Sequence, residues 1–112
     1  MRNVLPDSEH GVFHTGNLVI DFVHRVITLS GNELKLTPTE YSILCLLARY
    51  AGKVVTYSQI IREIWGPKYN PDPSYLRVYI LQIRRKVEED SANPKIIITE
   101  PGVGYRMLII EN

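Results

Sequence analysis

A cationic segment at residues 72–86, DPSYLRVYILQIRRK, contains the side chains best suited to binding a polyanion. From Arg77 to Lys86 it carries four cations and no anion. Guanidinium and hydroxyl groups can bind phosphate oxygens, and the Gln82 amide can pair with the edge of a base. The pattern therefore predicts a helix that enters the major groove of DNA. The alternative is a basic helix face that is only solvated, and the segment alone does not distinguish the two.

The apolar residues of this segment predict which face of the helix is buried. Asp72 can cap the helix, and Pro73 can open its first turn, where helices leave N–H groups unpaired. A buried stripe at helical spacing is predicted for Leu76, Ile80, Ile83 and Val87. The opposite face is predicted to carry Ser74, Val78, Leu81, Gln82 and Arg85, with Tyr75, Arg77, Tyr79 and Arg84 on its flanks.

The composition indicates one globular domain. A chain of 112 residues with 45% hydrophobic residues can bury a core without disulfides. Its net charge of +1 argues against a sequence-blind polycation but allows cations to collect on one face. No apolar run is long enough to span a bilayer and the first residues have no secretory core, so we expect a cytoplasmic protein. The single cysteine, Cys45, lies in an apolar run and is predicted to be a core residue.

Strands are predicted to precede the helices. Residues 1–10 are polar and read as a linker or arm, and residues 11–112 as the domain. The turn residues Ser30, Gly31 and Asn32 indicate a hairpin. An antiparallel four-stranded sheet is therefore expected from the β-rich runs 12–15, 18–22, 25–29 and 33–36.

Two capping patterns predict two helices before the cationic one. Thr37 and Glu40 form a capping box that opens a mostly apolar helix ending near Gly52, expected to be the centre of the core. Thr56 and Gln59 form a second box, and Gly66 stops that helix. After the cationic helix, runs 95–100 and 105–110 are joined by PGVG and read as a hairpin. The predicted fold is α+β, a winged helix-turn-helix with an N-terminal four-stranded sheet, three helices and a hairpin wing.

The sequence also allows predictions for the connection before the cationic helix and for the acidic residues after it. The connection at residues 66–72 is longer than the three or four residues of a tight helix-turn-helix, which indicates either a role of its own or ordinary variation in loop length. The acidic residues 88–90 are badly placed for the helix dipole, so we expect them to be exposed and turned away from a polyanion.

Several motifs then resemble one family. Over residues 18 to 107, the chain resembles the effector domain of OmpR/PhoB-type response regulators. The motifs that carry the resemblance are LTPTEYSILCLLARYAGKVVT, the WG after the second helix, YLRVYILQIRRKVE and ITEPGVGYR. Within that family they are most similar to the KdpE-type regulators of potassium-transport genes. The resemblance implies a transcription regulator domain that binds direct repeats in promoter DNA as a dimer. It also implies an RNA polymerase partner, and a sensor histidine kinase acting through a receiver domain absent from these residues.

The resemblance assigns roles to individual residues. Gln82 matches the base-contacting position, and the connection carries a polymerase-contact surface at Lys68, Tyr69 and Asn70. Phosphate contacts are implied for Trp65, Ser74, Tyr75, Tyr79 and Arg84, and wing contacts for Thr99, Gly102 and Tyr105. Arg77 and Arg85 join the DNA-binding set by their place on the cationic helix. Leu81 and Pro101 stand where relatives often carry arginine, so no phosphate contact or minor-groove insertion carries over to them.

Some of these residues also fit other roles. Trp65 and Tyr105 also fit core aromatics whose polar tips reach water, which is compatible with phosphate contact. His10, His14 and His24 are scattered without acidic or cysteine partners, and Cys45 lacks a neighbouring base, so we expect no enzyme, no metal and no cofactor. A winged helix that binds only protein is the remaining alternative. Salt-dependent DNA binding would separate the two.

Overall fold

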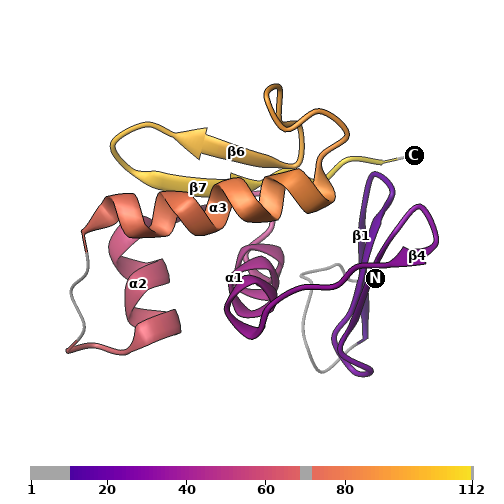
Figure 1. The fold of residues 1–112 in the computed structure, drawn as a ribbon, viewed down its shortest axis with the longest axis horizontal. Coiled ribbons are helices and arrows are strands. Elements are labelled where there is room, and N and C mark those ends of the chain that lie inside the picture. The colour runs from indigo at the N-terminus through magenta and orange to yellow at the C-terminus, as the bar shows by residue number, and fades with distance from the viewer. Residues whose placement is uncertain (1–10, 69–71, 112) are drawn as a thin grey trace.

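The computed structural model describes residues 11–68 and 72–111, which form two antiparallel sheets and three helices (Figure 1). The N-terminal sheet lies at one end of the molecule, and α1 lies between it and α2. The long helix α3 packs against α1 and α2 and runs alongside the C-terminal sheet. The predicted α+β winged-helix architecture is confirmed.

The N-terminal sheet has the order β1-β2-β3-β4. Its strands are Val12–Thr15, Leu18–Asp21, Val26–Leu29 and Asn32–Glu33. Side chains alternate across it, so that Leu18 and Ile20 are fully buried against the helices. The predicted hairpin turn is present, with positive φ at both Ser30 and Gly31, as a tight two-residue β-turn requires. The fourth strand ends at Glu33 rather than at residue 36, although the Leu34 N–H still donates to the Ile27 carbonyl on β3 at 2.8 Å.

Helix α1, Pro38–Arg49, is the centre of the core, as predicted. The Thr37 hydroxyl accepts a hydrogen bond from the Glu40 N–H at 3.2 Å, and a Glu40 carboxylate oxygen accepts one from the Thr37 N–H at 3.0 Å, which completes the capping box. The helix packs against α2, α3 and β7. It is buried almost around its whole circumference, which explains its run of apolar residues.

Two more capped helices follow. Helix α2, Tyr57–Trp65, begins where the Thr56 hydroxyl accepts from the Gln59 N–H at 3.1 Å. Helix α3, Pro73–Val87, begins where the Asp72 carboxylate accepts from the Ser74 N–H at 2.9 Å. Both N-caps were predicted, because a short side-chain oxygen before an apolar-periodic segment satisfies a helix's unpaired N–H groups.

The C-terminal sheet has the order β5-β7-β6 and contains a strand that the sequence reasoning missed. Its strands are β5 Val54–Thr56, β6 Ile97–Glu100 and β7 Gly104–Met107. The hairpin β6–β7 is the predicted wing, and β5 joins it from the segment between α1 and α2. A Cβ on Gly104 would lie 2.0 Å from the Val55 carbonyl oxygen, so this close pairing requires glycine.

The strand predicted to extend to residue 110 ends at Met107, and the segment after it connects the two sheets. The buried Thr15 hydroxyl donates to the Leu108 carbonyl at 2.6 Å and accepts from the Ile110 N–H at 2.9 Å. The Gly16 N–H donates to the Ile110 carbonyl at 2.8 Å. The backbone after Met107 therefore pairs with the β1–β2 turn, and this ends the β7 ladder. No helix in the described ranges is long and apolar enough to cross a membrane.

Candidate nucleic-acid interface

Helix α3 has one fully buried face and one exposed face. Leu76, Ile80 and Ile83 have no exposed surface and Val87 has 1%, so the predicted stripe is confirmed. The face turned away from the core exposes Ser74, Arg77, Val78, Leu81, Gln82 and Arg85. Helix α3 can therefore present this face to a partner without disturbing the core.

Three aromatic rings join the end of α2 to the first half of α3. The Trp65 ring centroid lies 6.1 Å from that of Tyr75 and 5.5 Å from that of Tyr79, and the two tyrosine rings are 5.9 Å apart. Trp65 and Tyr79 are half-buried, whereas Tyr75 is 48% exposed. Aromatic pairs at these distances stabilise the contact between the helices and leave polar ring atoms near the surface.

Arg84 is buried, unlike its neighbour Arg85. Its Nε and Nη2 donate to the Ile97 carbonyl at 3.1 and 2.9 Å, and Nη2 also donates to the Thr99 hydroxyl at 2.8 Å. The guanidinium carbon lies 5.7 Å from the centre of the Tyr105 ring. Burial lowers the pKa of Arg84, while Tyr105 and Glu88 act in the opposite direction. Arg84 thus holds β6 against α3 and gathers two residues singled out in the wing, Thr99 and Tyr105, into one cluster.

The wing loop stands beside α3. Pro101, Gly102 and Val103 are exposed, and Gly102 has a φ of 76°, a conformation that glycine adopts without strain. Tyr105 is 4% exposed and packs edge-on against Tyr57, with ring centroids 5.6 Å apart. Its burial raises its pKa. Tyr105 is therefore mainly a core aromatic, and Gly102 marks the exposed tip.

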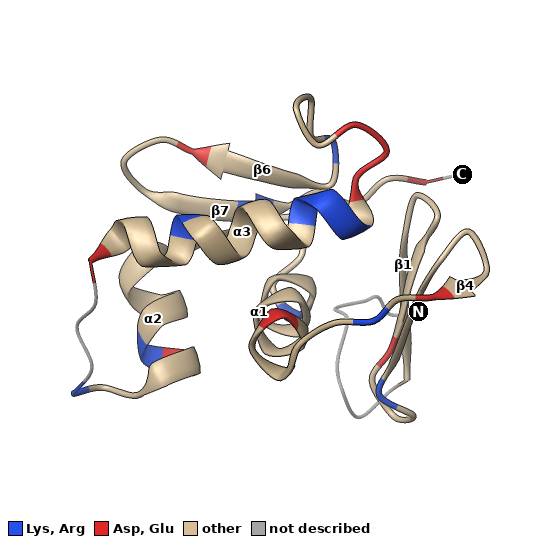
Figure 2. Ribbon diagram, viewed as in Figure 1, with Lys and Arg blue, Asp and Glu red and all other residues tan. Residues whose placement is uncertain are grey.

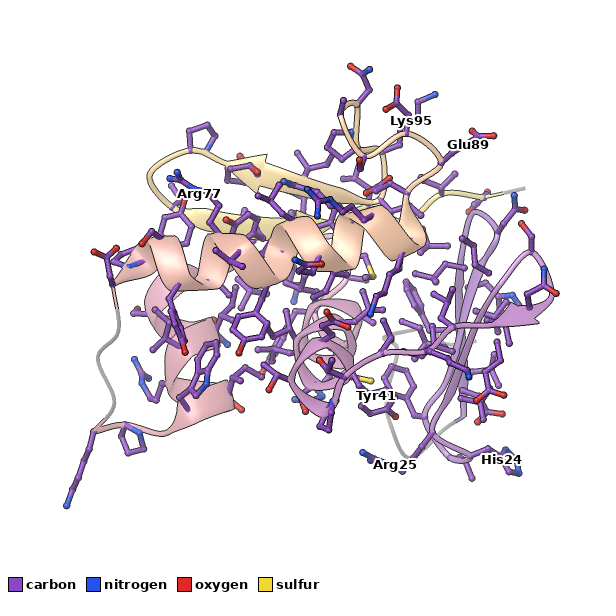
Figure 3. All side chains as sticks on the ribbon, in the orientation of Figure 1. His24, Arg25, Tyr41, Arg77, Glu89 and Lys95 are labelled. Carbon is purple, nitrogen blue, oxygen red and sulfur yellow. The ribbon has the colours of Figure 1, made fainter. Side chains whose placement is uncertain are left out.

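The cations of α3 differ in their exposure and in their partners. Figure 2 shows Lys and Arg along α3, and acidic residues in the loop after it, at the end opposite to the wing tip. Figure 3 shows Arg77 on the wing-tip side and Glu89 and Lys95 at the far end. Lys86 is drawn away from the exposed face, since its Nζ lies 2.7 Å from the Glu40 carboxylate and 3.0 Å from the Lys35 carbonyl. Arg77 and Arg85 are left as the exposed cations of α3.

The sequence from residue 31 to residue 107 matches the family described as "Transcriptional regulatory protein, C terminal". The chain belongs to this family. The transcriptional regulatory protein KdpE of Mycobacterium tuberculosis is 43% identical over 98 residues, which cover 88% of this chain and 43% of that protein. The match therefore places this chain on less than half the length of that curated relative.

Two solved structures agree with this membership in the transcriptional-regulator family. The response regulator DrrB of Thermotoga maritima, an OmpR/PhoB homolog, has a TM-score of 0.80 at 34% identity, over 88% of this chain and 44% of that one. The RstA DNA-binding domain of Klebsiella pneumoniae, solved in complex with the RstA box, has a TM-score of 0.78 at 28% identity, over 88% of this chain and 98% of that one. The fold is thus that of an OmpR/PhoB-type effector domain.

The expected exposure of the three acidic residues after α3 was wrong for one of them. Residues 88–90 were expected to be exposed together, but Glu88 is only 8% exposed. Its carboxylate accepts hydrogen bonds from the N–H groups of Lys95, Ile96 and Ile97 at 2.8 to 3.1 Å. These bonds occupy the N–H groups where β6 was expected to begin, so the strand starts at Ile97 rather than at Lys95. Glu89 and Asp90 are exposed, as predicted.

A signal for Glu88 and Arg84 was present in the sequence. Leu76, Ile80, Arg84 and Glu88 are spaced by four residues and continue one row of the helix surface. Because the first two were predicted to be buried, the row placed the two charged residues at the edge of the core, next to backbone groups that need partners. Their charges were instead read as a sign of exposure.

The connection between α2 and α3 is only partly described. Lys68 is exposed. Tyr69 and Asn70, which were grouped with it as a polymerase-contact surface, lie outside the described residues, as do residues 1–10. The exposed Lys68 is compatible with such a surface.

Of the residues considered for catalysis, Cys45 lies in the core, His14 on β1 and His24 in the turn between β2 and β3, whereas His10 lies outside the described residues. Burial raises the pKa of the Cys45 thiol, which disfavours the reactive thiolate. Burial, together with Cys45, raises the pKa of Tyr41 to about 12, and the Arg25 guanidinium lies over its ring at 4.6 Å. Within residues 11–68 and 72–111, no three His, Cys, Asp or Glu side chains are grouped to hold a metal ion.

Proposed function

We propose that this domain binds double-stranded DNA in a sequence-specific manner and is the effector half of a two-component response regulator. The observation that carries the proposal is the exposed face of α3, which presents Gln82 between two exposed arginines while the opposite face is fully buried. A helix of this kind fits the major groove, with Gln82 on a base edge and Arg77 and Arg85 on phosphates. RstA, whose fold this chain shares, was solved with its DNA box.

The remaining contacts are proposed to hold the domain on the DNA backbone. Hydroxyl, indole and guanidinium groups along the two helices and the wing, together with the backbone N–H of Gly102, would donate to phosphates. This set comprises Trp65, Ser74, Tyr75, Tyr79 and Arg84 on the helices, and Thr99, Gly102 and Tyr105 in the wing. Arg84 and Tyr105 are nearly buried, so their contacts would come from one edge of each group while the rest packs inside.

The wider role follows from the relatives. We propose that the intact regulator works in the cytoplasm, carries a receiver domain addressed by a sensor histidine kinase, and binds direct repeats as a dimer. The 43% identity to KdpE supports control of potassium-transport genes. Lys68, Tyr69 and Asn70 would form a surface for RNA polymerase beside the bound duplex.

Selection of bound duplexes from a random pool, followed by titration of the best site, tests the function. Gln82→Ala should lower discrimination at one or two base pairs by about 1–3 kcal/mol and leave the free energy of unfolding nearly unchanged. Arg49→Ala, which removes an exposed arginine from α1, is the control and should change neither. Unchanged base preference in Gln82→Ala would remove Gln82 from the readout.

One observation favours a second function. Val78 and Leu81 are large apolar side chains on the exposed face of α3, and such groups also suit a protein partner. A domain that binds only protein would show no salt-dependent affinity for any duplex. A DNA-binding domain that neutralises several phosphates loses affinity steeply as salt is raised.

A further inference from the structure

The exposed face of α3 carries an apolar row that phosphate binding does not explain. Val78 is 55% exposed and Leu81 is 44% exposed, and Tyr75, in line with them, is 48% exposed. These three are spaced by three residues, so they follow one another along the helix surface. Tyr75 is accounted for by its ring contacts with Trp65 and Tyr79. Val78 and Leu81 are left without a described role.

The neighbours of these two side chains place them in the middle of the proposed interface. Leu81 lies one turn before Arg85, and Val78 one turn before Gln82, so the four side chains form one patch. Single exposed apolar residues are common on proteins. Here two adjacent ones share a patch with a base-reading amide and an arginine, on the helix that would enter the groove.

The major groove offers one apolar group to such a patch, the C5 methyl of thymine. Residues 78 and 81 are separated by about 4.5 Å along the helix axis, at 1.5 Å per residue. Successive base pairs are about 3.4 Å apart. Two side chains at this spacing can therefore reach methyl groups on neighbouring base pairs, beside the pair contacted by Gln82.

We propose that Val78 and Leu81 determine part of the sequence specificity by packing against thymine methyl groups on base pairs next to the one read by Gln82. The inference rests on the proposed function and adds a class of base contact to it. A protein partner fits the patch less well, because a stable protein interface buries about 800 Å² on each side and this row is flanked by Arg77, Gln82 and Arg85.

Replacement of thymine by deoxyuridine tests the proposal, because it removes only the methyl group. The best site selected from a random duplex pool is synthesised with one thymine at a time replaced, and affinity is measured by fluorescence anisotropy. We expect about a fourfold loss at one or two positions, the effect of one buried methyl or methylene group. The salt dependence should not change, since the methyl carries no charge.

Protein variants assign each methyl to its side chain. Leu81→Ala and Val78→Ala should each bind the natural site about fourfold or more weakly, and each should become insensitive to deoxyuridine at its own position only. Both residues are exposed helix positions, so the variants should keep the thermal midpoint of unfolding. Val12→Ala, which truncates a 51% exposed valine on β1, is the matched control and should retain full sensitivity.

Four outcomes would overturn the inference. If a site is selected but no single deoxyuridine changes affinity, DNA recognition stands and the methyl contacts do not. The same holds if the two alanine variants keep the wild-type sensitivity, or if they lose self-association in sedimentation without DNA while binding the site normally, which would make the row a protein interface. If no sequence is enriched and no salt-dependent binding is seen, the proposed function fails together with the inference.

Discussion

The exposed face of α3 and the buried row that contains Arg84 use similar side chains in opposite ways. On the exposed face, Arg77, Gln82 and Arg85 extend into solvent. On the buried row, Arg84 and, at the end of the helix, Glu88 bind the backbone where β6 begins. The exposed face is free to meet a partner, whereas the buried row holds the wing in its place beside α3.

The difference shows that the charge of a residue does not indicate its role in this helix. Arg84 and Arg85 are adjacent in the sequence, yet one is 9% exposed and the other is exposed to solvent. What separates them is the row of the helix surface on which each lies. Arg84 continues the row of Leu76 and Ile80, which meets the start of β6. There the Ile97 C=O accepts a hydrogen bond from Arg84, and the Ile97 N–H donates one to Glu88.

Glu88→Ala should have the largest effect on stability, a loss of about 3 kcal/mol in the free energy of unfolding. It leaves the buried N–H groups of Ile96 and Ile97, and the part-buried one of Lys95, without their acceptor. Hydrogen bonds to a charged group contribute about 1.5–3 kcal/mol each when they are buried. Urea unfolding at pH 7 measures the loss, and amide exchange at residues 95–97 should accelerate. Glu89→Ala is the control, with a change within about 0.5 kcal/mol. Equal effects of the two would break the comparison.

Arg84→Ala and Arg85→Ala should separate the buried row from the exposed face with one residue type. Arg84→Ala should cost about 2 kcal/mol of unfolding free energy because the Ile97 carbonyl and the Thr99 hydroxyl lose their donor. Arg85→Ala should leave stability unchanged and lower the slope of log affinity against log salt by about one unit. Unfolding and salt titrations on the selected site measure both. A stable Arg84→Ala variant would show that the buried hydrogen bonds do not hold the wing.

Lys86→Met should destabilise the domain by about 1 kcal/mol at pH 7, since Lys86 is 34% exposed and water weakens its pair with Glu40. Burial raises the pKa of Glu40, but hydrogen bonds from Lys86 and the Thr37 N–H outweigh it and hold the pKa below its ordinary value of 4.5. A carboxyl with a lowered folded pKa stabilises above its unfolded pKa and loses that contribution as the pH falls through the folded one.

The difference in unfolding free energy between the wild type and Lys86→Met should therefore have its full value above about pH 5. It should shrink as Glu40 becomes protonated below about pH 4.5. Unfolding titrations from pH 7 to pH 3 measure it. Lys53→Met, at an exposed turn, is the control and should follow the wild type. A difference that does not depend on pH would place Lys86 with the solvated cations of the exposed face.

Lys68→Ala should have the smallest effect, within about 0.5 kcal/mol in both unfolding and DNA affinity, because Lys68 is an exposed loop residue outside α3. The proposed polymerase surface predicts a different result in the intact regulator. The variant should occupy its promoter but fail to activate transcription, as measured by footprinting and a reporter. Normal activation would reduce this loop to a connection between α2 and α3.

Local sequence patterns were sufficient for most of the fold. Thr37 and Glu40 marked the start of α1, Asp72 that of α3, and the spacing of Leu76, Ile80 and Ile83 showed which side of α3 is buried. Each of these signals acts within one or two helical turns, so it depends little on the rest of the chain. The exposed candidates on α3, including Gln82 and Arg85, follow from the same periodicity.

The wing and its attachment were decided by contacts between distant segments. Strand β5 is only three residues long and exists because β7 supplies its partner, nearly fifty residues later in the chain. Glu88 and Arg84 are buried because β6 brings unpaired N–H and C=O groups to α3, and β7 ends where Thr15 pairs with the tail. Backbone groups must be paired wherever water is excluded, and which side chain pairs with them depends on which segments meet.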